Sequence, residues 1–202
     1  MRVALTFDAE HPDRPTVSGV EERLLDVLDD LEVRATFFVQ GRWAEAFPST
    51  ARRMAARHLV GNHSHYHCRM PLLSDQGLSA DISSAESAIR RHVKVDPRPW
   101  FRCPFGAGAG DPRIIEALER RGYRHVGWDV SSSDWKRGRT AAGIVRDVAG
   151  QIGIRRGGIV LMHSWPSVTL RALPSLIDQL RLVGATFVGV DEMPIPSPDS
   201  VL

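Results

Sequence analysis

The chain has 202 residues, a length that suits one domain with a substantial hydrophobic core. Hydrophobic residues make up 43% and charged residues 25%, which is ordinary for a soluble globular domain. A formal net charge of +2 without a Lys/Arg block argues against a nucleic-acid partner, and no apolar run is long enough to span a membrane.

Short apolar runs alternate with helical patterns, which predicts an α/β domain with a parallel sheet. Strands are expected at Val3–Phe7, Ala35–Val39, Leu59–Gly61, Trp100–Arg102, His125–Trp128, Ile159–Met162 and Phe187–Val190. Helices are expected at Val20–Leu31, Ile114–Arg121, Ala141–Ile152 and Leu170–Leu182. The stretches Arg69–Leu78 and Cys103–Asp111 lack a clean period and are predicted to be loops. With no repeat or linker, residues 1–202 read as one domain, either a small barrel or an open doubly wound sheet.

The start of the chain and its cysteines bear on the cellular compartment. Residues 1–8 enter a strand pattern at once, which leaves no room for a signal peptide. We therefore expect a cytoplasmic protein if Met1 is the native start, and otherwise a secreted domain from which a leader was trimmed. Cys68 and Cys103 do not make a disulfide framework, and buried packing is the expected use of both.

The run from His63 to His67 predicts a metal site. The two residues are four apart, so one helical turn or tight loop can aim both imidazoles at one ion. Neutral imidazole suits zinc and its first-row neighbours, and two such ligands leave positions for a carboxylate and water. The alternative is a polar surface turn whose histidines are hydrated.

Polar residues stand at or just past the ends of five predicted strands. They are Asp8, His63, Arg102, Asp129 and His163. In a barrel, the loops after all strands converge on the carboxyl face, where active sites are built. We therefore expect one catalytic site on that face.

With these residues in order, the sequence resembles the polysaccharide deacetylase family, the NodB-homology domain of carbohydrate esterase family 4. The segments that carry the resemblance are Leu5-Thr-Phe-Asp, Ala35-Thr-Phe-Phe-Val, Gly61-Asn-His-Ser-His-Tyr-His, Arg102-Cys-Pro-Phe, Trp128-Asp-Val-Ser-Ser-Ser-Asp-Trp and Ile159-Val-Leu-Met-His. The resemblance implies a distorted (β/α) barrel of about seven parallel strands. It also implies hydrolysis of acetyl groups from sugars with one divalent metal, usually zinc, with cobalt, manganese or nickel as alternatives.

The resemblance also implies roles for the residues at the strand ends. Asp8 matches the general base, and Arg102 matches the arginine that holds this base through a charge-assisted pair. His163 matches the general acid that protonates the leaving amine. His63 and His67 match the two metal histidines, and Ser64 matches the residue that steadies their loop.

Three aromatic residues are expected to touch the substrate. Phe105 matches the position whose backbone N–H binds the oxyanion. Trp135 and Trp165 are expected to wall the pocket and stack on a sugar ring; the alternative is ordinary aromatic packing.

Two positions depart from the family pattern. Where the family has its metal carboxylate, this chain has Ala9, which cannot bind a metal. Glu10 is the preferred substitute because residues 8 and 10 point the same way on an extended chain, and His11 is a lesser candidate. In the fourth motif Ser131 replaces the aspartate that tunes the catalytic histidine, and we expect Asp129 to supply that charge.

The leading hypothesis is a metal-dependent hydrolase that removes N-acetyl groups from an amino sugar, an oligosaccharide or a related glycoside. An alternative on the same fold is hydrolysis of a cyclic imide or ureide. The third hypothesis is an inactive carbohydrate-binding descendant, for which Ala9 and Ser131 would be the signs. The expected partner is thus a carbohydrate or another small molecule, with no nucleic acid and no membrane, and the sequence predicts no particular oligomeric state.

Overall fold

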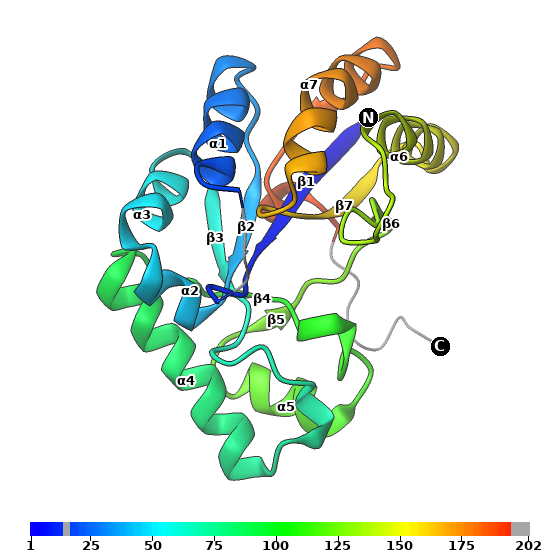
Figure 1. Ribbon diagram of the computed structural model, residues 1–202. Helices are drawn as coiled ribbons and strands as arrows, with labels where there is room; N and C mark the ends of the chain where they lie inside the picture. Colours follow the sequence, from blue (N-terminus) through cyan, green and yellow to red (C-terminus); the bar gives the residue numbers. More distant parts are fainter. Residues whose placement is uncertain (14–16, 195–202) are drawn as a thin grey trace.

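The fold is a parallel sheet curled into an open barrel (Figure 1). The computed structural model describes residues 1–13 and 17–194. Its strands are β1 (Arg2–Ala9), β2 (Thr36–Val39), β3 (Leu59–Asn62), β4 (Trp100–Phe101), β5 (Arg124–His125), β6 (Val130–Ser131), β7 (Gly158–His163) and β8 (Thr186–Phe187). The order is β5-β4-β3-β2-β1-β7-β6, with β8 also paired to β1, and every pairing is parallel. Since β5 and β6 end this series, the barrel stays open between them.

Strand β1 lies in the middle of the sheet, and both of its faces are buried. Its odd-numbered residues Val3, Leu5, Phe7 and Ala9 belong to the main hydrophobic core. Ala4 belongs instead to a smaller cluster with Phe38 and Val126. The alternation of side chains along a strand therefore places Asp8 on the same face as Ala4, inside the barrel.

The helices pack around the sheet. They are α1 (Val20–Asp30), α2 (Gly41–Ala46), α3 (Pro48–Arg57), α4 (Asp75–His92), α5 (Pro112–Glu119), α6 (Ala141–Arg155) and α7 (Ser167–Leu182). Helices α1, α7 and α6 lie side by side against one part of the sheet (Figure 1). Side-chain caps begin three helices: Ser74, Asp111 and Thr140 accept from backbone N–H groups of the first turns of α4, α5 and α6. Within the residues described, none of the helices has the length and apolarity to cross a membrane.

The predicted fold class is confirmed: the chain is a single-domain α/β protein with a distorted barrel of parallel strands. The seven predicted strands overlap β1–β5, β7 and β8, but β6 was not predicted. The predicted loop at Arg69–Leu78 is partly wrong, because a 3-10 turn occupies Met70–Leu72 and α4 begins at Asp75. None of the predicted helices corresponds to α2, α3 or α4. Cys68 and Cys103 are free; Cys103 is buried as expected, whereas Cys68 is only partly buried.

Candidate metal and catalytic site

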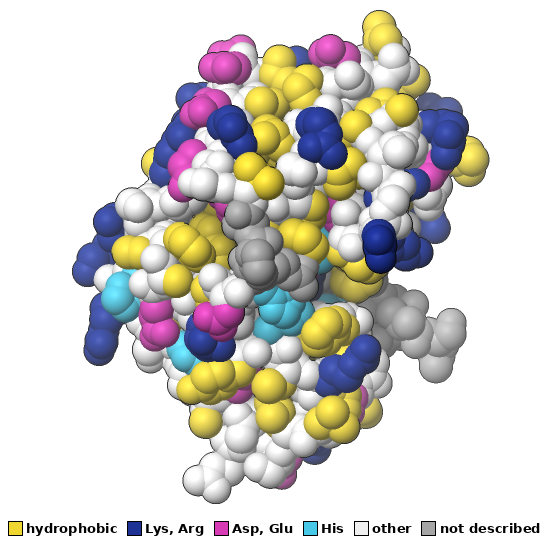
Figure 2. All heavy atoms as spheres, viewed as in Figure 1, with side chains coloured by type: hydrophobic (Ala, Val, Ile, Leu, Met, Phe, Trp, Pro, Cys, Tyr) yellow, Lys and Arg dark blue, Asp and Glu magenta, His cyan; other side chains and the backbone are white. Residues whose placement is uncertain are grey.

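Histidines and carboxylates gather at the carboxyl ends of the central strands. Asp8 and His163 pair across β1 and β7, and His63 directly follows β3. Histidine side chains reach the surface near the centre of the face in Figure 2, with hydrophobic side chains on both sides. The five strand-end residues of the sequence analysis do not all meet here, because Asp129 lies elsewhere.

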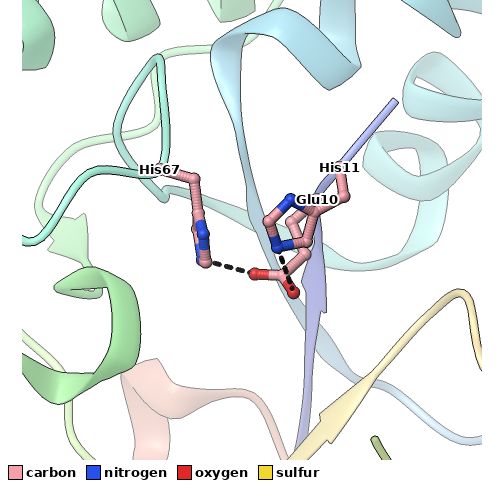
Figure 3. A group of neighbouring side chains, drawn as sticks. All are labelled: Glu10, His11 and His67. Carbon is pink, nitrogen blue, oxygen red and sulfur yellow. Dashed lines mark ion pairs between the residues drawn. The ribbon is translucent and has the colours of Figure 1, made fainter. Parts of the chain in front are cut away.

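Glu10 lies among the histidines at the end of β1 (Figure 3). Its Oε2 atom is 2.5 Å from His67 Nε2, and its Oε1 atom is 3.3 Å from His11 Nε2. Burial alone would raise the pKa of Glu10, but its close contacts with the imidazoles of His11, His63 and His67 outweigh it and hold the pKa well below its ordinary value. The structure therefore puts a carboxylate where the sequence proposes the third ligand, while Ala9 is fully buried in the hydrophobic core.

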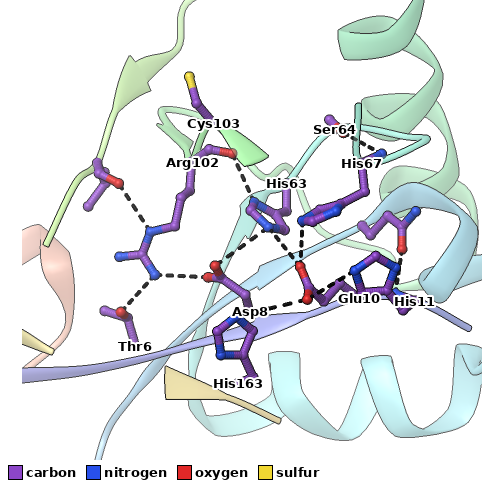
Figure 4. A network of polar contacts seen from close by, with 12 residues as sticks. Thr6, Asp8, Glu10, His11, His63, Ser64, His67, Arg102, Cys103 and His163 are labelled. Carbon is purple, nitrogen blue, oxygen red and sulfur yellow. Dashed lines mark hydrogen bonds and ion pairs between the residues drawn. The ribbon is translucent and has the colours of Figure 1, made fainter. Parts of the chain in front are cut away.

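His63 faces both carboxylates of the site (Figure 4). Its Nδ1 atom is 2.9 Å from the carbonyl oxygen of Arg102, so this nitrogen carries the proton and donates it. Its Nε2 atom is 3.5 Å from Asp8 Oδ2 and 3.4 Å from Glu10 Oε2, and it is buried without a hydrogen bond. Burial alone would lower the pKa of His63, but the charges of Asp8 and Glu10 outweigh it and raise that pKa. This nitrogen is stable between two carboxylates only when it carries a proton or binds a metal cation, so these residues fit a metal.

The loop between the two predicted metal histidines is a tight turn. Ser64 and His67 adopt left-handed φ values of 63° and 57°. The Ser64 hydroxyl accepts from the backbone N–H of His67 at 2.9 Å, and Asn62 Oδ1 accepts from the Ser64 N–H at 2.9 Å. The carboxylate of Asp81 in α4 accepts from the backbone N–H groups of His65 and Tyr66. These contacts bring the rings of His63 and His67 to 4.9 Å between centroids.

Arg102 holds Asp8 inside the barrel (Figure 4). Its Nη1 atom donates to Asp8 Oδ1 at 2.9 Å and to Thr6 Oγ1 at 2.8 Å. The rest of the guanidinium donates to the carbonyls of Val126 and Gly127, at 3.1 Å each. Arg102 is fully buried, and this burial lowers its pKa. The pair places an oriented carboxylate beside the histidines, in the arrangement that a general base needs.

His163 is held by Asp134, and the prediction that Asp129 would be its partner is wrong. Asp134 Oδ1 is 2.8 Å from His163 Nδ1, and its Oδ2 accepts from the His163 backbone N–H and from Thr169 Oγ1. Burial alone would lower the pKa of His163, but the hydrogen bond and charge of Asp134 outweigh it and raise that pKa. Asp129 instead accepts from the N–H of Ile159, at the opposite end of β7.

Three aromatic side chains border the histidines. Trp135, 44% exposed, meets the His163 ring edge-on at 5.1 Å between centroids, and Trp165 lies 5.8 Å from the same ring. Phe105, 55% exposed, meets His67 at 4.5 Å and has a left-handed φ of 58°. The two tryptophans therefore stand beside the predicted general acid, and Phe105 beside a predicted metal ligand.

Comparison with known proteins adds a family and several relatives. Residues 1–126 match the family model described as polysaccharide deacetylase. A peptidoglycan N-acetylglucosamine deacetylase of Bacillus cereus is 33% identical over 95% of this chain and 67% of its own length. A family 4 acetyl xylan esterase of Clostridium thermocellum in complex with a cobalt ion is 29% identical, with a TM-score of 0.82 over 99% of this chain and 96% of that one. A Bacillus anthracis protein described as a CE4 family pseudoenzyme is 26% identical, with a TM-score of 0.81 over 95% and 64%.

Proposed function

Since this chain belongs to the polysaccharide deacetylase family, we propose that it hydrolyses N-acetyl groups of an amino sugar, an oligosaccharide or a related glycoside, with the help of one divalent metal. The observation that carries the proposal is that a carboxylate and an imidazole, each held in place by a partner residue, stand on either side of the metal-binding cluster. Asp8 is held by Arg102 and His163 by Asp134, and Glu10 and the two histidines lie between them. Amide hydrolysis requires such a pair, in which one group acts as a general base and the other as a general acid.

Glu10, His63 and His67 are the residues that would hold the metal. Two imidazoles and a carboxylate suit zinc best, and cobalt, manganese or nickel next. When bound, such an ion acts as a Lewis acid that polarises the acyl oxygen and makes water more acidic.

The protein side chains then divide the proton transfers. Asp8 takes a proton from the attacking water, and Arg102 keeps its carboxylate aimed during that step. The new C–O bond forms at the acyl carbon, and the backbone N–H of Phe105 donates to the oxyanion. His163, whose Nδ1 is held by Asp134, delivers a proton from Nε2 to the nitrogen as the C–N bond breaks. The exposed face of Trp135 gives a sugar ring a surface to stack on.

The test combines metal content with product release. The purified protein, loaded with zinc or cobalt, should bind one ion and release acetate from N-acetylglucosamine oligomers. His63→Ala should lose the ion, whereas Asp8→Asn should keep it and lose turnover. Turnover retained in Asp8→Asn would contradict the assignment of the base.

The same assays separate the two other hypotheses. Ring opening of a simple cyclic imide without acetate release would point to the imide or ureide reaction. A protein that binds no ion and shows no turnover on either substrate would match the inactive descendant, a state for which the Bacillus anthracis relative sets a precedent in this fold.

A further inference from the structure

We propose that His11 is an additional ligand of the metal at Glu10, His63 and His67, so that three imidazoles and one carboxylate hold the ion. This inference rests on the proposed function, because it presupposes that a metal binds. His11 directly follows Glu10, and its ring points back toward the Glu10 carboxylate and His67 (Figure 3).

The backbone turns sharply at His11 to bring the ring into the site. Its φ of 57° lies in the left-handed region, which is unfavourable for a residue other than glycine. The buried side chain of Gln40 holds this turn: its Oε1 accepts from the His11 N–H at 2.8 Å, and its Nε2 donates to the carbonyl of His65 at 3.1 Å. One amide thus fixes the chain after β1 against the loop that carries the metal histidines.

The distances around Glu10 suit a coordination sphere. Ligand atoms about 2.1 Å from a tetrahedral ion lie about 3.4 Å apart. The separation of His11 Nε2 from Glu10 Oε1 is 3.3 Å, and that of His63 Nε2 from Glu10 Oε2 is 3.4 Å. His67, at 2.5 Å from Glu10 Oε2, would have to move outward by about 1 Å to reach this spacing, and His63 would have to approach the group formed by Glu10, His11 and His67.

His11 and His67 also approach each other. Their rings meet edge-on at 4.5 Å between centroids, and the ligand atoms of Glu10, His11 and His67 all lie within 4.8 Å of one another. The simpler role for His11 is a hydrogen bond to the carboxylate from outside the coordination sphere. That role would leave the ligand count at three, and the number and kind of ligands distinguish the two roles experimentally.

Cobalt(II) is the probe, because its visible absorption reports the ligands around it as well as its affinity. The metal-free protein is titrated with Co²⁺, and zinc affinity follows by competition. His11→Gly is the variant of choice, since glycine accepts the left-handed φ and removes only the imidazole. Lys94→Gly is the matched control: Lys94 also has a positive φ, 70°, but stands beyond the end of α4. His63→Ala reports the proposed site itself.

We expect the wild type and Lys94→Gly to bind one Co²⁺ with the same spectrum. His11→Gly should bind about 10-fold more weakly or worse, since even loss of a partner outside the coordination sphere typically costs about 10–100-fold. Its absorption bands should shift and change in intensity, and millimolar imidazole should restore them by filling the vacated position.

Two results would overturn the inference and leave the proposed function standing. One is His11→Gly that keeps the wild-type spectrum and affinity; the other is weaker binding with an unchanged spectrum and no response to imidazole. Wild-type protein that binds no Co²⁺ would overturn both the inference and the proposed metal site. Loss of binding in His63→Ala together with normal binding in His11→Gly would refute the role of His11 alone.

Discussion

Replacing Ala9 by Asp tests which face of β1 serves the site. Ala9 is fully buried in the main hydrophobic core with Phe7, whereas Asp8 and Glu10 face the histidines. A carboxylate at position 9 should therefore enter the hydrophobic core instead of the metal cluster. We expect Ala9→Asp to be destabilising, and Ala9→Asp combined with Glu10→Ala to bind no metal.

The cost follows from the ionisation of the new side chain. In the unfolded chain an aspartate ionises with a pKa of about 3.9, so at pH 7 it is charged. The core would force it to stay protonated, and each pH unit above the unfolded pKa costs about 1.4 kcal/mol, or about 4 kcal/mol at pH 7. For a chain of this size that lowers Tm by about 8–16 °C. The penalty grows as pH rises above the unfolded pKa and nearly vanishes near pH 4.

Thermal unfolding followed by circular dichroism measures this prediction. The difference in Tm between Ala9→Asp and the wild type should be large at pH 7 and small at about pH 4.5. Ala9→Asn is the control for added volume and polarity, and its deficit should not depend on pH. The reasoning is refuted if Ala9→Asp is as stable as the wild type at pH 7, or if the combined variant with Glu10→Ala binds Co²⁺ normally.

Three further predictions address the groups that support the site and the core. Asp134→Asn should move the alkaline fall of kcat to lower pH, because Asp134 raises the pKa of His163 and the general acid acts only below that pKa; a pH profile of deacetylation checks this. Arg102→Met should cost about 3–5 kcal/mol in urea unfolding by leaving Asp8 buried without its partner, and Asp8→Asn in the same background should recover part of the loss. Burial lowers the pKa of His58 to about 4, so its contribution is complete above about pH 6.5 and lost as pH falls toward 4, about 3 kcal/mol in all; His58→Gln should flatten this acid-side loss in urea midpoints between pH 7 and 4.5.

The strands that carry the site could be predicted because they are long apolar runs. Strands β1 and β7 are buried on both faces and read as such in the sequence. Strand β6 could not be found in this way, because it has two residues and is defined by its pairing with β7. Helix α4 was not predicted at all, although Ser74 caps it, and its first turn was assigned to a loop because the segment before it has no helical period.

The partner of His163 shows what spacing alone cannot decide. Asp129 and Ser131 lie two apart, and a regular strand would place both on one face, which motivated the choice of Asp129. The strand β6 is only Val130–Ser131, and the chain after it turns so that Asp134 meets His163. The sequence did contain a signal, the family-like pair of Asp134 and Trp135, and both of these residues contact His163.

The turns around the metal cluster carry the geometry that no periodic pattern encodes. Among the described residues, eight other than glycine have a positive φ, and four of them are His11, Ser64, His67 and Phe105. Left-handed backbone is costly for such residues and persists where surrounding contacts enforce it, here through Gln40 and Ser64. The rings of two of these residues, His11 and His67, lie against the Glu10 carboxylate. For this reason the identity of the histidines could be predicted from their spacing, whereas the entry of His11 into the cluster had to be found in the structure.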